Sequence, residues 1–220
     1  MWKRTLDVAG TSRDLIRRLL EGYGQTFAQE LDIKIRPVSP SALFRLLCFA
    51  LLASARIRQE QALSAARALT ESGWSTPKKM AATTWERRVK VLNTHGYARY
   101  DEKTSRFLAD TSTLLLEKYG GDLRKLREAA ERDPAREREL LRECKGIGDV
   151  GVDIFFREAQ AIWDELYPFG DQRALRAARR LGLPADAKSL ARLVPRTQFA
   201  RLIAALVRVD LAKAHAKLKC

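Results

Sequence analysis

The amino-acid sequence predicts an all-α protein, and three observations lead to this prediction. Apolar residues recur at spacings of three and four along most of the chain, as on one face of a helix. Ser, Thr or Asp stands before several apolar segments, in places followed directly by Pro, and Gly follows several of them. Almost no segment shows the alternation of a half-buried strand.

The expected helices follow one another from Ser39-Pro40 onward. Ser39 caps the first, and residues 41–52 are apolar on nearly all sides, so we expect this helix to be central. The later helices are expected at 59–72, from Thr76-Pro77, from Thr84 to about Gly96, from Asp101 to Gly120, from Asp122, from Asp133-Pro134, and at 150–163, 172–181, 187–194 and 196–217.

Composition and charge limit the function classes. With 220 residues, of which 46% are hydrophobic, the chain can bury one core, as a single domain or as two closely packed lobes. Its 41 Lys and Arg against 27 Asp and Glu give a formal net charge of +14, which indicates a polyanionic partner. Nucleic acid is favoured, although an acidic membrane or a ribosomal contact fits the charge alone equally well.

Cysteine and apolar patterns indicate a protein of the reducing cell interior. Cys48, Cys144 and Cys220 are too few and too scattered for a disulfide framework, and no pair has a metal-ligand spacing. The N-terminus lacks an apolar signal core, and the longest apolar run, 46–55, is too short to span a bilayer. We therefore expect a soluble cytoplasmic protein, nucleoid-associated if bacterial, with no metal site and no membrane partner.

The most informative segments are 141–150 and 168–184. The first predicts a helix that ends at Gly146-Ile147-Gly148, where the next helix begins, so that backbone N–H groups could hold a phosphate. We expect both glycines to make turns that a side chain would block. A Gly-x-Gly turn alone is more often only a helix cap. In the second segment Asp171 begins an arginine-rich helix, either as an ordinary N-cap or as a functional carboxylate.

Three segments resemble, in the same order, motifs of the helix-hairpin-helix base-excision DNA glycosylases, the superfamily of endonuclease III. Ser54-Ala-Arg56 resembles the Ser-Ala-Gln turn, Thr94-His-Gly-Tyr97 the Thr-Ile-Gly-Leu loop, and Gly146-Ile-Gly148 the hairpin glycines. The register runs from about Pro40 to Pro184. The resemblance implies two helical lobes: a six-helix barrel over 40–165 with the hairpin near 141–155, and a second lobe from 1–39 and 166–220 that carries Asp171.

The resemblance also implies an activity and its partner. Double-stranded DNA with a modified or mispaired base would be bound, the base flipped out, and its N-glycosidic bond hydrolysed to leave an abasic site. Asp171 would stabilise the positively charged sugar and steer the attacking water. No protein partner is implied, and the sequence does not indicate which base is excised or the oligomeric state.

Further positions correspond to DNA contacts of that superfamily. Arg56 would fill the space of the flipped base, and Tyr97 would wedge the opposite strand. Tyr167 or Phe169 is expected in the base pocket because both lie in the loop next to Asp171. The alternatives are a solvated arginine, a half-buried tyrosine and core aromatics. The remaining expected DNA contacts are Lys145, Gly146, Ile147, Gly148, Val150 and Arg173.

Two departures from endonuclease III narrow the prediction. Bifunctional members carry a Schiff-base lysine just past the hairpin, where this chain has Val150, and Lys145 lies at the other end of the turn. We therefore expect a monofunctional glycosylase without AP lyase activity. The four C-terminal cysteines of an iron–sulfur cluster are also missing, so we expect no cofactor, although hairpin carbonyls could hold a monovalent cation.

Two other function classes stay open at the level of sequence. A non-catalytic helix-hairpin-helix DNA-binding protein, with Asp171 as a cap only, fits the charge and the glycines equally well. A binder of anionic surfaces unrelated to repair explains the charge but not the ordered motifs.

Overall fold

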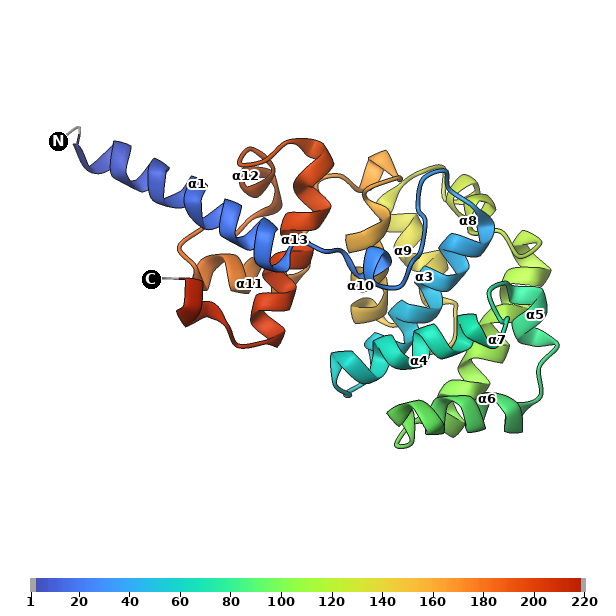
Figure 1. Cartoon of the computed structure of the whole chain (residues 1–220). Helices are drawn as coiled ribbons and strands as arrows, with labels where there is room; N and C mark the ends of the chain where they lie inside the picture. Colours follow the sequence, from blue (N-terminus) through green and yellow to red (C-terminus); the bar gives the residue numbers. More distant parts are fainter. Residues whose placement is uncertain (1–2, 219–220) are drawn as a thin grey trace. The chain divides into compact units, whose positions relative to one another are not determined.

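The computed structural model describes residues 3–218, and side chains from Ser12 onward, as two helical units (Figure 1). Unit 1 combines the two chain ends, up to Glu30 and from Arg157, and unit 2 is the continuous segment Leu31–Phe156. The described residues form α-helices and short 3₁₀ and π segments, and none of them lies in a strand. The all-α prediction is therefore confirmed.

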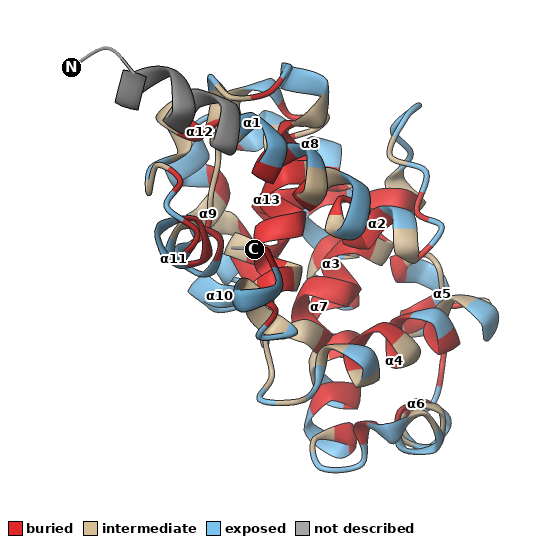
Figure 2. Ribbon diagram, turned by 60° about the vertical axis from the view of Figure 1, so that its left-hand side comes forward, coloured by how far each residue is buried: buried red, intermediate tan, exposed pale blue. Residues whose placement is uncertain are grey.

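Unit 2 is built around α3, the predicted central helix. Ten of its residues are buried, and Ser39 caps it by accepting a hydrogen bond from the Ala42 amide at 3.1 Å. Figure 2 shows buried residues concentrated along α3 and α7 in this unit. The elements are α3 (Pro40–Ala53), α4 (Gln59–Glu71), α5 (Pro77–Ala81), α6 (Trp85–Leu92), the π turn η1 (Asn93–Tyr97), α7 (Asp101–Tyr119), α8 (Leu123–Ala129), α9 (Pro134–Arg142) and most of α10 (Asp149–Ala159).

The predicted capping residues of unit 2 are found, with one exception. Thr76, Thr84, Asp122 and Asp133 each accept a hydrogen bond from a backbone amide of the helix that follows. The prediction that Asp101 caps α7 is wrong, because the helix already begins at this residue. Its buried carboxylate instead accepts hydrogen bonds from the side-chain Nδ2 of Asn93 at 2.8 Å and from the backbone amide of Glu102 at 2.7 Å.

Unit 1 is centred on α13, which has nine buried residues and packs against α1 and α11. We had expected one helix over 196–217; α13 ends at Leu211, and Lys213 has a positive φ of 52° before η3 begins. The elements of this unit are α1 (Lys3–Tyr23), α2 (Phe27–Glu30), the end of α10, η2 (Asp164–Leu166), α11 (Gln172–Arg180), α12 (Ala187–Ala191), α13 (Arg196–Leu211) and η3 (His215–Leu218).

The division between the units falls inside α10 and differs from the expected lobe boundaries. We expected divisions after residues 39 and 165, whereas the units divide after Glu30 and Phe156. The last turn of α10 belongs to unit 1 because Arg157 pairs with Asp171, and Glu158 accepts a hydrogen bond from the Ala28 amide. Within the described residues, no helix is both long and apolar enough to cross a lipid bilayer.

Candidate functional site

The turn between α9 and α10 is fixed against α7 in a way that requires glycine at position 146. Gly146 has φ +86°, and a Cβ atom there would lie 2.5 Å from Cδ2 of Phe107. The hydroxyl of Thr111 donates a hydrogen bond to the Lys145 carbonyl at 3.1 Å. A side chain at 146 would be strained and would also clash, so packing within unit 2 determines this glycine.

The other two residues of the turn correct the sequence analysis. A Cβ atom at Gly148 would meet no atom of the chain within 4 Å, so the chain's own packing does not require this second glycine. Ile147 is buried in unit 2, and its amide donates to the Cys144 carbonyl at 3.0 Å. Its side chain anchors the turn, so only its backbone is available for DNA, whereas the Lys145 side chain is exposed.

An acidic residue at the start of α10 was missed by the sequence analysis. Asp149 directly follows the hairpin glycine, and its carboxylate is exposed. Arg138 and Arg142 of α9 lie 3.7 and 3.6 Å from it, and Arg138 also pairs with Asp153 at 2.6 Å. The two arginines offset the negative charge of Asp149, which lies at the helix N-terminus where a phosphate would otherwise be favoured. Next to it Val150 is 60% exposed, which is unusual for a large apolar side chain.

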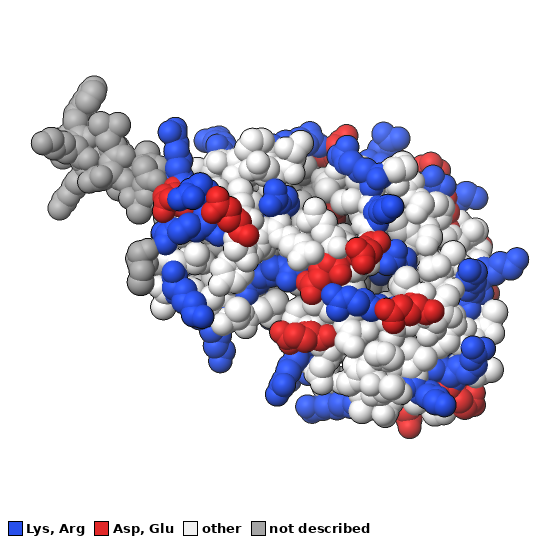
Figure 3. Space-filling view, in the orientation of Figure 1, with Lys and Arg blue, Asp and Glu red and all other residues white. Residues whose placement is uncertain are grey.

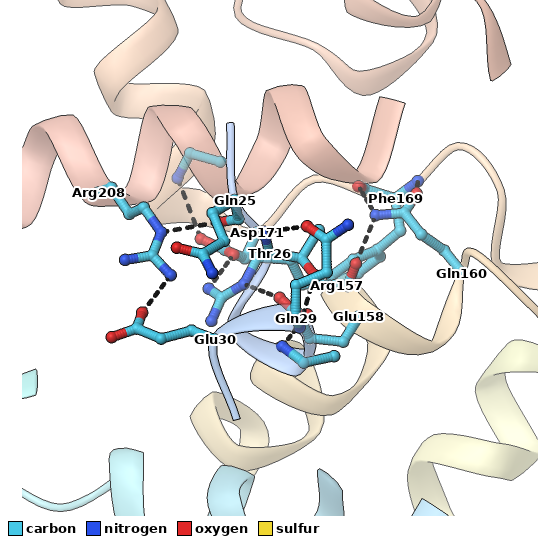
Figure 4. Close-up of polar contacts among 12 residues, drawn as sticks. Gln25, Thr26, Gln29, Glu30, Arg157, Glu158, Gln160, Phe169, Asp171 and Arg208 are labelled. Carbon is cyan, nitrogen blue, oxygen red and sulfur yellow. Dashed lines mark hydrogen bonds and ion pairs between the residues drawn. The ribbon is translucent and has the colours of Figure 1, made fainter. Parts of the chain in front are cut away.

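Asp171 caps α11 and is almost fully buried, with 6% of its surface exposed. Figure 4 shows it next to Arg157. Its Oδ1 accepts hydrogen bonds from the Arg173 and Ala174 amides at 2.9 and 3.0 Å. Its Oδ2 accepts one from Nη1 of Arg157 at 2.8 Å. The N-cap interpretation is confirmed, and both carboxylate oxygens have partners within unit 1.

Arg157 is the residue of this site that the sequence analysis missed. It lies between two carboxylates, with Nε 3.7 Å from Oε1 of Glu158 and Nη1 bound to Asp171, and its guanidinium lies 5.0 Å from the ring centre of Phe27. Oε2 of Glu158 accepts a hydrogen bond from the Ala28 amide at 2.9 Å. Burial raises the pKa of Glu158, and the nearby Arg157 charge partly opposes this. A charged Arg-Glu pair directly after Ile154-Phe-Phe156 was the available signal.

The surroundings fix the segments that carry this cluster. Gln160 holds the loop before Asp171, because its side-chain amide donates to the Phe169 carbonyl and its oxygen accepts from the Phe169 amide, both at 3.0 Å. Arg208 of α13 lies 4.2 Å from the ring centre of Phe27 and donates to the Gln25 carbonyl at 2.8 Å. The loop before Asp171 is therefore fixed by Gln160, and the first turn of the helix after it is bound to the Asp171 carboxylate.

The expectation that Tyr97 inserts into DNA does not agree with its environment. Its ring is fully buried, and its hydroxyl donates a hydrogen bond to the Leu52 carbonyl at 3.0 Å. Burial also raises its pKa to about 12. We therefore assign Tyr97 to the core of unit 2. Arg56 is exposed, so its predicted role in DNA stays a prediction.

The two aromatic residues expected in a base pocket are half-buried in unit 1. Tyr167 packs edge-to-face against Phe199 at 5.3 Å, and the guanidinium of Arg196 lies 4.6 Å from its ring centre. The Phe169 backbone is held by Gln160 as described. These contacts already account for the ring of Tyr167, and the pocket role of both residues stays a prediction.

The described residues contain no group of three His, Cys, Asp or Glu side chains that could hold a metal ion. Cys48 and Cys144 are buried thiols, and burial raises the pKa of Cys144 to about 12. Such thiols are poor ligands and poor nucleophiles at neutral pH. The monovalent cation considered at the hairpin stays a prediction.

Comparison with solved structures identifies endonuclease III as a protein of similar fold. A non-covalent endonuclease III–DNA complex matches 91% of this chain and 85% of its own, with a TM-score of 0.54 and 17% identity. A trapped endonuclease III–DNA covalent intermediate, an estranged-adenine complex, matches 74% and 71%, with a TM-score of 0.49 and 19% identity. No protein-family model and no curated protein matches the sequence. The chain has an endonuclease III-like fold.

Proposed function

We propose that this protein binds double-stranded DNA through the α9–α10 hairpin and acts as a monofunctional DNA glycosylase. It would flip a modified or mispaired base out of the duplex and hydrolyse its N-glycosidic bond with Asp171, leaving an abasic site. The observation that carries the proposal is the carboxylate of Asp171, held at the N-terminus of α11 in an endonuclease III-like fold. One solved structure of similar fold, a non-covalent endonuclease III–DNA complex, contains DNA.

The geometry of Asp171 suits electrostatic stabilisation better than proton abstraction. Oδ1 is fixed by two backbone amides and Oδ2 by Arg157, so the negative charge has a fixed position. When the glycosidic bond breaks, positive charge develops on the sugar, and a fixed carboxylate can stabilise that charge without reorganising. In this role Asp171 would not need to deprotonate the attacking water, which would need only to be oriented toward the sugar.

The hairpin supports DNA binding through its backbone. Gly148 is exposed and is not required by contacts within the chain, which fits a position that a phosphate approaches closely. Lys145 is exposed at the same turn. Val150 has no amine, so no Schiff base can form there, and strand cleavage through that route is not expected.

A second function is favoured by one observation. Asp171 is nearly buried, and each of its oxygens already has a strong partner. A carboxylate that serves only as a cap and as an ion-pair partner would have this environment. The corresponding function is a non-catalytic helix-hairpin-helix DNA-binding protein.

One experiment separates the two functions. Purified protein is incubated with duplexes that each carry one alkylated, oxidised, deaminated or mismatched base, and hot alkali then reveals abasic sites. We expect strand breaks with the wild type and with Asp186→Asn, a control at the exposed N-cap of α12, but not with Asp171→Asn. Binding by all three proteins without base loss on any duplex would support the non-catalytic function instead.

A further inference from the structure

The exposed face of α11 divides into two halves. Because successive residues turn by about 100° around a helix, Arg173 and Arg180 fall within about 20° of each other. Gln172, Arg176 and Arg179 lie together on the adjoining arc, about 60° wide. All five side chains are exposed, whereas the opposite face consists of the buried Ala174, Ala177 and Ala178.

The arginines of the first half are held by an acidic residue of α13. Nη1 of Arg180 lies 3.0 Å from Oδ1 of Asp210, and Nε of Arg173 lies 4.0 Å from its Oδ2. The side chain of Asp210 is only 14% exposed, so it is a well-positioned counter-charge. Its carboxylate offsets part of the charge of both arginines and draws their side chains toward α13.

The second half has no such counter-charge. Arg176 and Arg179 are exposed, and neither has a hydrogen bond, ion pair or ring contact with the side chains described between residues 12 and 218. The helix itself contains no acidic residue. Elsewhere in this unit, the exposed Arg17 and Arg196 each pair with a neighbouring carboxylate. These two guanidinium groups therefore keep their full charge and their donors available.

We propose that Gln172, Arg176 and Arg179, the α11 strip, bind the phosphate backbone of double-stranded DNA. Guanidinium groups bind phosphate oxygens in a bidentate geometry, and Gln adds a neutral donor at the end of the helix next to Asp171. The strip is about 10 Å long, enough to reach neighbouring phosphates of one strand. This inference rests on the proposed DNA binding but does not need catalysis, and it replaces Arg173 as the expected contact of this helix.

The net charge favours DNA over an acidic protein as the partner. Lys and Arg side chains are spread over the visible surface of both units, with acidic side chains interspersed (Figure 3), and the chain as a whole carries +14. A duplex offers a regular row of phosphates to such a surface, whereas an acidic protein would need carboxylates arranged to fit one strip.

The test uses two double variants that each remove two positive charges. Arg176→Gln/Arg179→Gln removes the unpaired cations, and Arg173→Gln/Arg180→Gln removes the paired ones, so their effects on net charge are equal. Binding to an undamaged fluorescent duplex is measured by anisotropy between about 50 and 200 mM salt. We expect the first variant to lose about tenfold in affinity and to have a salt slope shallower by about 1 to 2, and the second to lose less than about threefold.

The outcomes separate this inference from the proposed function. Arg176→Lys/Arg179→Lys keeps the charges and should retain most of the salt slope. Equal losses in the two Gln variants would mean that only net charge matters and would overturn the strip. Unchanged DNA affinity in Arg176→Gln/Arg179→Gln would also overturn it and would point to an acidic protein partner. A wild type that binds no duplex would overturn the DNA-binding function itself, and the strip with it.

Discussion

Replacing Arg157 by Met tests whether the buried ion pair holds Asp171 in place. Methionine fills a similar volume but leaves Oδ2 of Asp171 without its donor and removes the positive charge beside Glu158. The side chains of Arg157 and Asp171 are only 5% and 7% exposed, so water cannot easily replace the lost contacts. Breaking one partner of such a buried pair lowers the free energy of unfolding by about 3–5 kcal/mol.

The stability lost in Arg157→Met should depend on pH because of the buried carboxyl group of Glu158. Burial raises its folded-state pKa above the usual value near 4.5, so the folded state binds the proton more tightly than the unfolded state does. Its contribution to stability therefore falls as pH rises from 4.5 through the raised pKa. Without Arg157 this pKa rises further, and the deficit of Arg157→Met should be larger at pH 8 than at pH 5.

Urea and thermal unfolding followed by circular dichroism measure both effects. A change of this size lowers Tm by about 10 °C in a chain of this length. The control is Arg180→Met, which removes the ion pair between Arg180 and Asp210. The side chain of Arg180 is 60% exposed, so we expect the free energy of unfolding to fall by less than about 1 kcal/mol. An Arg157→Met protein as stable as this control at both pH values would show that the pair does not hold the site.

Three further results are expected. Gly146→Ala should lower the free energy of unfolding by about 2–4 kcal/mol, because φ is +86° and the new Cβ clashes with the ring of Phe107 in α7. Gly148→Ala should change stability little but weaken DNA binding. Thermal melting and fluorescence anisotropy measure the two effects. Asp149→Asn should raise DNA affinity several-fold and steepen its salt slope by about 1, since an anion leaves the hairpin; an unchanged slope would place the phosphate elsewhere. Borohydride should trap no protein–DNA adduct, because Val150 has no amine; an adduct lost in Lys145→Ala would contradict this assignment.

The sequence predicted those features that depend on residues close together in the chain. Caps at Ser39, Thr76 and Asp133 could be recognised because each accepts a hydrogen bond from an amide two or three residues ahead. The largely apolar composition of α3 predicted its central position for a similar reason, since a helix that is apolar on nearly all sides is expected to be buried. Asp171 was located as a cap by the same local rule.

Features that depend on contacts between distant segments could not be predicted in this way. Periodicity gave no indication that the Tyr97 hydroxyl would reach a carbonyl 45 positions earlier, and the resemblance pointed instead to an exposed loop residue. Arg157 meets Asp171 only because α10 continues past the hairpin into unit 1, and the sequence pattern of α10 does not specify this contact 14 positions ahead. The division at Asp210 between paired and unpaired arginines likewise needs α13 beside α11.

Replacing Asp171 by Asn affects its two roles differently, because an asparagine side chain can still cap α11 but carries no negative charge. Asparagine is as good an N-cap as aspartate, so Asp171→Asn can keep its bonds to the α11 amides. Its other group would then be an NH₂ facing Nη1 of Arg157, which places two donors against each other at a buried position. A loss of base release in the single variant could therefore arise from a displaced loop as well as from a lost charge. Arg157→Met/Asp171→Asn contains neither the opposed donors of Asp171→Asn nor the unpaired buried carboxylate of Arg157→Met, so it should recover part of the stability lost in Arg157→Met. If it is folded and binds DNA but releases no base, the lost carboxylate charge accounts for the lost activity.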